Sequence, residues 1–586
     1  MDKYTVINFR TATGKKSLKL RIPEKIQENQ EEKKEIKKGY IGQSSFVVPQ
    51  QIQQKEEESS EEMESVKVLK SHAIALPIIE IEKPEELLDT YDLKTIVVKY
   101  PLYPSSPKQG ERVFAYAHIY FDNVANELVY HIVEPALSEA DRKVLEDIKE
   151  FIEEKLDVNF GQIRNAEVAN YITGIFDRAV KYFRIKSDTE VLKYYVIRDF
   201  IGLEMIEPLM RDKNIEDISC DGVDIPIYVY HRDPRFGSLR TNIMFTNRDL
   251  LDSFANKLSE RTGKVISVAR PLLDGTLPDG SRVQATLGSD IARHGSNFTI
   301  RMFTENPITP VDMLKFGTCD TRLLAYLWFL IEHESSILVS GGTASGKTSL
   351  LNVLSLFIKP QMKIVSIEDT AELRLPHPHW VPEVARTPIA EEGKVDMFEL
   401  LRESLRQRPD YIIVGEVRGR EAYVLFQQMA VGHAGLSTIH ADTFPKLMDR
   451  LTTQPINLPV SLLQNLDMVL FVKRVKQGKR YNRRVASVIE ILGHDQKINM
   501  PITLEVFRWD PLKDTFNLVN KSAILRKIIN STGMSEEDVQ KEIINRSNVL
   551  KWMYKNKVED YRKISSMINL YYLAPDFLLN KIEGGL

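Results

Sequence analysis

Glycines, a lysine and a threonine occur between residues 341 and 348 at a spacing that binds phosphate. The segment GGTASGKT matches the pattern G-x-x-x-x-G-K-[ST], whose successive backbone N–H groups form an anion-binding nest. Lys347 is expected to contact the β- and γ-phosphates of a nucleotide, and Thr348 is expected to coordinate Mg²⁺. The residues expected to bind the nucleotide are Gly341, Gly342, Thr343, Ala344, Ser345, Gly346, Lys347, Thr348 and Ser349.

The sequence on either side of this loop supports the phosphate-binding interpretation. An apolar run at 335–340 predicts a strand before the loop, and residues 349–358 predict a helix after it. A helix N-terminus adds positive potential to the nest, and glycine allows the positive φ angles and the close approach of a ligand. The alternative is a glycine-rich turn without a ligand, which does not explain this order of strand, loop and helix.

Three acidic residues lie at the end of a second apolar run and just after it. The run at 363–368 leads into a segment that contains Glu368, Asp369 and Glu372. One of these carboxylates can orient or deprotonate the water that attacks a phosphate. The alternative is an acidic cluster that complements the dipole of a following helix. The residues alone leave the choice among the three open.

A further acid ends the apolar run at 411–416. This run ends in Glu416 and is followed by Arg418 and Arg420. Glu416 is expected to hold Mg²⁺ through water or to position the nucleophile, and the alternative is a glutamate in a surface turn. Ligands of open α/β sheets bind outside the carboxyl ends of the strands. The shared position of these acids and of the phosphate loop therefore predicts one common site.

Two histidines and several arginines are further candidates for the site. His433 lies in a glycine turn before the strand predicted at 436–440, and His440 ends that strand. An imidazole near the γ-phosphate can sense bound nucleotide, whereas a lone histidine is more often structural. An arginine can stabilise phosphate charge across a domain or subunit interface, and the alternative is a surface ion pair. The arginine candidates are Arg270, Arg282, Arg301, Arg386, Arg402 and Arg406.

Continuous apolar runs alternate with helical stretches from about residue 319 onward. The predicted strands are 335–340, 363–368, 411–416, 436–440 and 467–474, with edge strands expected at 483–492 and 502–509. Such runs are typical of a parallel sheet with helices on both faces, so the predicted fold class is α/β. The last sixty or so residues have the amphipathic spacing of helices.

The region before residue 311 is predicted to be α+β. Strands are expected at 97–103, 114–121, 127–135, 217–220, 226–231 and 298–303, hairpins in 271–286, and helices at 138–156, 163–183, 201–210 and 250–261. The expected organisation is a charged, flexible tail at 1–72, an α+β domain at 73–195, a second N-terminal domain at 196–310, an α/β domain at 311–500, and C-terminal edge strands with a helical subdomain at 501–586.

Composition excludes several classes of protein. The chain has 586 residues, a formal net charge of −3 and two cysteines, Cys220 and Cys319. Nucleic-acid-binding domains are usually strongly basic, so direct nucleic-acid binding is not expected. Two isolated cysteines exclude a four-cysteine zinc site and are expected to be buried thiols in a reducing cytosol. The apolar runs are shorter than the ~18 residues of a membrane span, and we expect a cytoplasmic protein.

The motifs, in this order, resemble those of the type II/IV secretion ATPase superfamily. GGTASGKT is similar to its Walker A motif, IEDTAEL to its aspartate box, RPDYIIVGEVRGREA to its atypical Walker B motif and AVGHAGLSTIHA to its histidine box. PLMRDKNIEDISCDGVDIPIYVYH and LPDGSRVQAT resemble the second N-terminal domain of the family, so the resemblance spans about residues 75–586. The sequence resembles the archaeal branch of the family in three features: it lacks a four-cysteine zinc site, and it contains the segments FAYAHIYF and NVLKWMYKNKVEDY.

This resemblance implies a RecA-like P-loop ATPase domain that is preceded by α+β N-terminal domains, the second PAS-like, and by the charged flexible tail. It also implies a homohexamer that binds ATP and Mg²⁺ at domain clefts and holds no zinc. By the same resemblance, Glu372 is the favoured catalytic carboxylate, Glu416 the Walker B acid and His440 the histidine-box residue. Arg282 and Arg301 are the arginine candidates from the second domain.

The family further implies a cytoplasmic enzyme that hydrolyses ATP to ADP and phosphate at the inner face of a membrane. It would drive assembly of a type IV pilus-like filament, or secretion, through a polytopic membrane platform protein, and act on pilin-like subunits indirectly. The alternatives are an archaellum assembly or rotation motor, a DNA-transport ATPase and a non-enzymatic, ATP-dependent scaffold. The modest net charge weighs against DNA transport, and the presence of Lys347, Glu372 and Glu416 weighs against the scaffold.

Overall fold

The computed structural model describes residues 4–10, 17–23, 70, 73–79, 93–155, 165–233, 235–288, 290–303, 307–386, 393, 395–477 and 480–583. The chain forms two compact units, Met1–Glu62 and Met63–Leu586. In the first unit, β1 (Tyr4–Arg10) pairs antiparallel with β2 (Ser17–Pro23). This hairpin lies inside the segment for which the sequence predicts a flexible tail, and, apart from residue 70, the remainder of that segment lies outside the described residues.

The first large sheet joins the two N-terminal regions that the sequence separates at residue 195. Its strands are β3 (Val97–Tyr103), β4 (Ala115–Asp122), β5 (Glu127–Val133), β6 (Ile215–Cys220), β7 (Pro226–His231), β8 (Ser238–Met244), β9 (Leu272–Thr276), β10 (Arg282–Thr286) and β11 (Asn297–Arg301), in the order β3-β4-β5-β8-β7-β6-β11-β10-β9. The joint is the parallel pair of β5 and β8, in which Val129 lies opposite Arg240. The sequence does not predict β8, so it does not predict this continuity.

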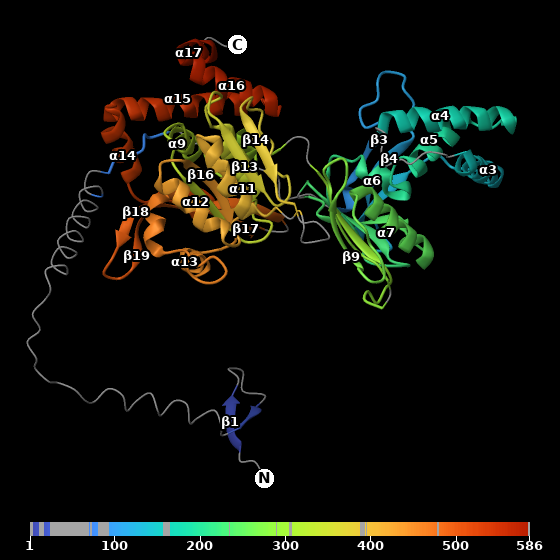
Figure 1. The fold of residues 1–586 in the computed structure, drawn as a ribbon, viewed down its shortest axis with the longest axis horizontal. Helices are drawn as coiled ribbons and strands as arrows, with labels where there is room; N and C mark the ends of the chain where they lie inside the picture. The colour runs from blue at the N-terminus through green and yellow to red at the C-terminus, as the bar shows by residue number, and fades with distance from the viewer. Residues whose placement is uncertain are drawn as a thin grey trace, which may run out of the picture. The chain divides into compact units, whose positions relative to one another are not determined.

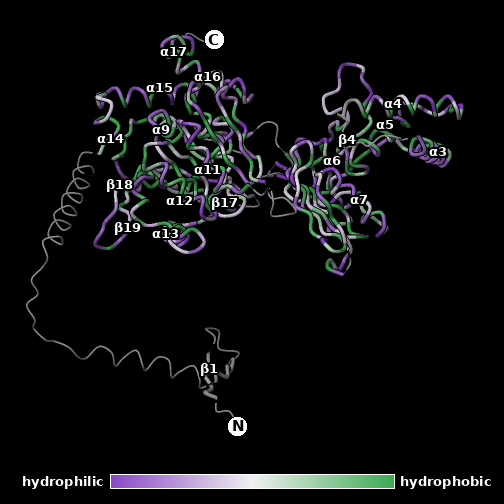
Figure 2. The backbone as a smooth tube through the Cα atoms, viewed as in Figure 1, coloured by the Kyte–Doolittle hydropathy of each residue, from purple (hydrophilic) through white to green (hydrophobic). Residues whose placement is uncertain are grey.

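Helices pack against this sheet and around one hydrophobic core. They are α3 (Glu139–Lys155), α4 (Asn165–Tyr182), α5 (Thr189–Phe200), α6 (Glu207–Met210) and α7 (Arg248–Thr262), with short 3-10 turns at Leu93–Thr95 and Glu204–Ile206. Helices α3, α4 and α5 contact one another (Figure 1), and α3 carries mostly hydrophilic residues (Figure 2). Helix α5 begins at an N-cap, Asp188, and runs across residue 195. The helix predicted at 201–210 is reduced to a 3-10 turn and the short α6.

The second large sheet confirms the predicted α/β fold class. Its strands are β12 (Ile337–Gly341), β13 (Ile364–Glu368), β14 (Trp380–Val384), β15 (Tyr411–Val414), β16 (Ala434–Ile439), β17 (Met468–Gln477), β18 (Arg480–Asp495), β19 (Met500–Asp510) and β20 (Thr515–Leu518), in the order β14-β13-β15-β16-β12-β17-β18-β19-β20. The strands from β14 to β17 are parallel, and β18 to β20 continue the sheet antiparallel. The loop strand β12 therefore lies between β16 and β17, in the interior of the sheet.

Helices cover both faces of the second sheet. Ile337 and Val339 of β12 belong to one buried cluster and Leu338 to another, which shows that alternate residues enter different cores. The helices around this sheet are α8 (Pro310–Lys315), α9 (Thr321–Glu332), α10 (Lys347–Leu356), α11 (Met397–Ser404), α12 (Glu421–Ala430) and α13 (Phe444–Thr452), with 3-10 turns at Leu405–Gln407 and Val460–Asn465. This arrangement confirms the parallel sheet with two covered faces that the apolar runs predict.

The C-terminal end is helical, as predicted, and packs on α9. Its helices are α14 (Ala523–Thr532), α15 (Glu536–Lys555), α16 (Tyr561–Leu573) and α17 (Pro575–Glu583), drawn in red in Figure 1. Helix α9 contacts α15 and is buried along most of its length, because its apolar run lies inside the core. Arg546 of α15 is 1% exposed and forms ion pairs with Glu332 and Glu542, so its buried charge is compensated.

Candidate functional site

The phosphate loop connects the buried strand β12 to helix α10. Gly346 is the N-cap of α10 and has a φ of +92°, and Ala344 has a φ of +56°. A Cβ atom at Gly341 would lie 2.4 Å from the backbone oxygen of Val472, so no larger residue fits there. The predicted strand, loop and helix are therefore confirmed, and their backbone has the turn that an anion nest requires.

Lys347 lies within the loop and close to two of the predicted acids. Its Nζ donates a hydrogen bond to the backbone oxygen of Gly342 at 3.1 Å. Burial lowers the pKa of the Lys347 amine. The charges of Glu416 and Glu372 oppose this shift, because they favour the protonated form. The structure thus brings together a loop lysine and two carboxylates that are far apart in the sequence.

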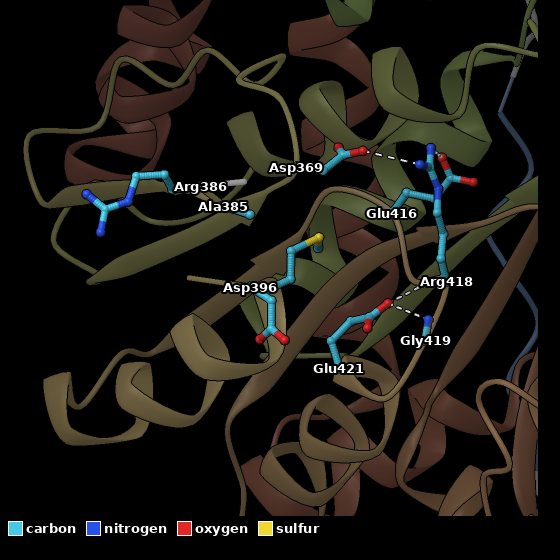
Figure 3. Close-up of a pocket in the computed structure, with 9 residues that line it drawn as sticks. Asp369, Ala385, Arg386, Asp396, Glu416, Arg418, Gly419 and Glu421 are labelled. Atoms are coloured by element: carbon cyan, nitrogen blue, oxygen red, sulfur yellow. Dashed lines mark hydrogen bonds and ion pairs between the residues drawn. The ribbon is translucent and has the colours of Figure 1, made fainter. Parts of the chain in front are cut away.

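Glu416 follows β15 and is paired with Arg418. The Arg418 guanidinium donates to Glu416 at 2.7 Å and to Asp369, after β13, at 3.2 Å (Figure 3). Burial acts to raise the pKa of Glu416, but the hydrogen bond and charge of Arg418 and the charge of Lys347 outweigh it and lower this pKa. Glu416 is therefore a carboxylate that stays ionised beside the phosphate loop.

The three acids of the aspartate-box segment have different environments. Glu368 is 2% exposed, and its Oε1 accepts hydrogen bonds from the backbone N–H groups of Glu372 and Leu373, both at 3.0 Å. Asp369 and Glu372 are both exposed, and Asp369 forms an ion pair with Arg418. Asp369 and Glu372 are thus both accessible to water, Glu372 is the one of the two that is not paired with Arg418, and Glu368 holds the backbone that carries Glu372.

Burial raises the pKa of Glu368 from 4.5 to about 7. The folded protein therefore keeps a proton on Glu368 up to about pH 7, whereas the unfolded chain releases it near pH 4.5. The stability that this proton provides is fully present below pH 4.5 and is lost as the pH rises through 7.

The variant Glu368→Gln cannot ionise and should flatten this dependence. Between pH 5 and pH 8, the free energy of unfolding of the variant should rise relative to wild type by up to about 3 kcal/mol. Urea unfolding at several pH values measures the difference. Glu403→Gln, at an exposed glutamate of α11, is the control. Parallel pH profiles for wild type and Glu368→Gln would contradict the expectation.

The two candidate histidines lie at opposite ends of β16. His440 follows the carboxyl end of the strand, and its charge acts on Glu416, so it belongs to the site. His433 precedes the amino end, where its Nδ1 is 2.9 Å from the backbone oxygen of Pro409. A six-residue strand separates the two rings by roughly 20 Å. His433 is therefore not brought to the phosphate loop and has the structural role that the sequence left as the alternative.

The candidate arginines Arg282 and Arg301 lie directly opposite each other on β10 and β11. Arg282 is hydrogen-bonded to Asp274 at 3.1 Å, and this bond raises its pKa, with smaller contributions from the charges of Asp369 and Glu372. Arg301 forms an ion pair with Asp217 at 3.2 Å. Of this pair, Arg282 is the one on which the acids after β13 act electrostatically.

The other arginine candidates have local partners. Arg406 and Arg402 form ion pairs with Glu403 on the exposed side of α11, at 2.8 and 3.7 Å. Arg386 donates to the backbone oxygen of Gly393. Arg270 pairs through its backbone with Ser267. The contacts of Arg402 and Arg406 are the surface ion pairs of the alternative, whereas those of Arg386 and Arg270 are with the backbone.

A cavity of about 320 Å³ opens beside Glu416 at the carboxyl ends of the parallel strands (Figure 3). Its lining residues are Asp369, Ala385, Arg386, Asp396, Met397, Glu416, Arg418, Gly419 and Glu421. The turn after β15 is fixed by Glu421, which accepts the backbone N–H groups of Arg418 and Gly419, each at 2.6 Å. The edge strand β14, which the sequence does not predict, precedes Ala385 and Arg386 on one side of this cavity.

The oxygen donors of the site suit Mg²⁺ bound with a nucleotide. The Thr348 hydroxyl and the Glu416 carboxylate are hard oxygen ligands, and Mg²⁺ usually takes one or two protein oxygens together with phosphates and water. Within the described part of the chain, no group of three or more His, Cys, Asp or Glu residues is arranged to hold a metal ion. Cys220 and Cys319 are buried free thiols, as the sequence predicts.

Two residues near the loop were missed by the sequence reasoning. Asp442 follows His440, and its Oδ1 would lie 2.7 Å from a Cβ atom at Gly342. Arg483 of β18 donates to the backbone oxygen of Ala344 at 3.2 Å. The short segment HADT is a signal that points to Asp442, whereas no local pattern points to Arg483, which lies 139 residues from its partner.

Comparisons with known proteins give a consistent set of relatives. The model of the family described as type II/IV secretion system protein matches residues 202–502, and a model described as PilB3-like, C-terminal, matches residues 512–585. An uncharacterised protein of Methanocaldococcus jannaschii is 38% identical over 81% of this chain and 90% of its own length. The type IV secretion system protein PtlH of Bordetella pertussis is 32% identical over 49% of this chain and 93% of its own length.

Among solved structures, the VirB11 ATPase of the Brucella suis type IV secretion system is 25% identical. That match covers 48% of this chain and 95% of the VirB11 chain, with a TM-score of 0.25. Within the described ranges, the chain has no helix that is both long and apolar enough to span a membrane.

Proposed function

Because the chain belongs to the type II/IV secretion system protein family, we propose that it hydrolyses ATP to ADP and phosphate and works as a motor of that machinery. The observation that carries the proposal is the clustering of Lys347, Glu416 and Glu372 around one phosphate loop. A loop lysine, an ionised acid and an accessible acid are the groups that phosphoryl transfer to water requires.

Each residue of the site has its own role in the proposed reaction. The loop amides and Lys347 bind the phosphates of Mg·ATP, and Thr348 and Glu416 supply oxygen ligands to its metal ion. Glu372 accepts a proton from a water molecule as the water oxygen bonds to the γ-phosphorus. The bond from the γ-phosphorus to the β–γ bridging oxygen breaks, and ADP leaves with that electron pair. Lys347 compensates the charge that develops on the phosphate oxygens.

The motor function is the finer part of the proposal. A homohexamer, bound peripherally at the cytoplasmic face of a membrane, would act through a polytopic platform protein on a type IV pilus-like filament or a secretion substrate. Arg282 and Arg301 of the N-terminal sheet, with His440 beside Glu416, are the groups proposed to respond to the γ-phosphate. ATP and ADP differ by this phosphate, so they favour different arrangements of the groups that bind it.

Phosphate release by the purified chain with Mg²⁺ and ATP, together with the particle mass in solution, tests the proposal. We expect steady turnover from a particle of six chains, loss of turnover to background when EDTA removes Mg²⁺, and recovery when Mg²⁺ is restored. Turnover that persists in EDTA would contradict the assignment of Thr348 and Glu416 to Mg·ATP. ATP-dependent assembly without phosphate release, with and without added lipid, would favour the scaffold instead.

A further inference from the structure

The phosphate loop contains a non-glycine residue in the left-handed region of backbone conformation. Ala344 has a φ of +56°, two residues before Gly346 at +92°. A Cβ atom disfavours this region, so the conformation persists only where surrounding groups hold it. The Ala344 side chain is exposed, so burial of its methyl group does not provide the restraint.

A restraint is provided by Arg483 of β18. Its Nε donates a hydrogen bond to the backbone oxygen of Ala344 at 3.2 Å. Its Cδ would lie 3.0 Å from a Cβ atom at Gly346, so the side chain runs along the outside of the loop from one left-handed residue to the other. Gly346 therefore has a φ angle that favours glycine, and the Arg483 side chain packs against it.

Arg483 is held in this position from the opposite face of its strand. Its neighbour Arg484 is 4% exposed and forms two hydrogen bonds to Asp514, both at 2.8 Å. Arg484 also donates to the backbone oxygens of Phe316 and of Arg483 itself, each at 2.9 Å. Successive side chains of a strand point to opposite faces, so anchoring Arg484 on one face directs Arg483 toward the loop.

A second arginine lies directly opposite but is engaged elsewhere. Arg474 of β17 is the cross-strand partner of Arg483, and like charges in such a pair are destabilising. The Arg474 guanidinium stacks 4.0 Å above the ring of Tyr481 and donates to the Tyr230 hydroxyl at 3.4 Å. The two arginines therefore lie at paired positions of neighbouring strands and carry the same charge, but Arg483 contacts the loop and Arg474 is bound elsewhere.

We propose that Arg483 is a positioning residue of the nucleotide site, which holds the peptide after Ala344 so that the loop amides face the phosphates before ATP binds. The inference rests on the proposed function and adds a residue that lies outside the recognised motifs. Arg483 acts through the loop backbone and not through contact with the reacting atoms. Its contribution therefore belongs to nucleotide affinity, because a preorganised nest loses less conformational freedom on binding.

The experiment measures Mg·ATP affinity by calorimetry, and KM and kcat by phosphate release, in the full chain. Arg483→Met should raise Kd and KM roughly five- to tenfold, the effect of about one hydrogen bond, with kcat within about twofold of wild type. Arg483→Lys keeps the charge but loses the fixed Nε donor, and it should behave like Arg483→Met. Arg474→Met, the matched control, should bind ATP like wild type.

A second substitution separates positioning from direct attraction of phosphate. Ala344→Gly removes the Cβ atom that disfavours the left-handed conformation. In that background Arg483→Met should cost clearly less affinity than in wild type, because less strain remains to be restrained. The inference would be overturned if Arg483→Met lowered ATP affinity as much in the Ala344→Gly background as in wild type, or if Arg483→Lys kept the full affinity of wild type. Either result would show that Arg483 acts through its charge.

Different experimental results would contradict the role of Arg483 and the proposed ATPase function. A wild-type chain that binds and hydrolyses ATP, with Arg483→Met unchanged in affinity, would overturn the inference alone. A wild-type chain that does not bind ATP would overturn both. Equal thermal unfolding of wild type and Arg483→Met, checked by circular dichroism, is expected because the Arg483 side chain is exposed.

Discussion

Replacement of Lys347 by alanine is expected to lower ATP turnover by about three orders of magnitude or more while the fold stays intact. The Lys347 amine is the cation inside the loop, and its removal leaves the charge that develops on the γ-phosphate without its nearest compensation. The folded state loses little, because the hydrogen bond of Lys347 is to the backbone oxygen of Gly342 in its own loop. Phosphate release and urea unfolding measure the two effects.

The control for this variant is Lys363→Ala. Lys363 immediately precedes β13, at the amino ends of the strands and therefore at the opposite edge of the sheet from the loop. Its Nζ donates to the backbone oxygen of Gln407 and has no role in the proposed reaction. Wild-type turnover in Lys347→Ala would show that the loop is not the hydrolytic site.

Replacement of Glu372 by glutamine is expected to lower kcat by roughly 10²- to 10⁴-fold, the usual contribution of a general base. The amide keeps the shape of the carboxylate but does not accept a proton from water. ATP affinity should stay near that of wild type, because Glu372 acts on the nucleophile and not on the bound phosphates. Single-turnover phosphate release and ATP calorimetry separate these two quantities.

The same measurements on Asp369→Asn test the choice among the three acids. Glu368 is buried and the exposed Asp369 forms an ion pair with Arg418, which leaves Glu372 as the exposed acid of the segment that is not paired with Arg418. Asp369→Asn should therefore retain more activity than Glu372→Gln. If Asp369→Asn shows the greater loss of kcat, the catalytic carboxylate has been assigned to the wrong residue.

The elements that carry the site were predictable because their signals are local. Strands β12, β13, β15, β16 and β17 are short buried runs, and each predicted run overlaps the observed strand. By contrast, β14 contains Pro382 and is only half-buried at the sheet edge, so it lacks a continuous apolar run. Strand β8 alternates between more exposed and more buried positions, but Thr241 at a buried position is polar and interrupts the apolar pattern. Missing β8 also concealed the single sheet that spans residues 97–301.

The sequence by itself determined the phosphate loop, the α/β class and the set of acids and histidines that follow the strands. These features depend on residue types within a few positions of one another, which local patterns record. The sequence did not determine which of these acids and histidines lie at the phosphate loop. His433 and His440 lie in one short segment, and only the bounds of β16 show that they face opposite edges of the sheet.

The tertiary structure decided the remaining relations because they join distant parts of the chain. The Arg418 bridge between Glu416 and Asp369 requires β13 and β15 to be neighbours. The contact of Arg483 with the loop requires β18 to follow β17 in the sheet, with Arg484 anchored on the other face. The raised pKa of Glu368 depends on burial, which the packing of the whole domain creates. Packing, strand order and burial are properties of the folded chain and appear in no single segment of its sequence.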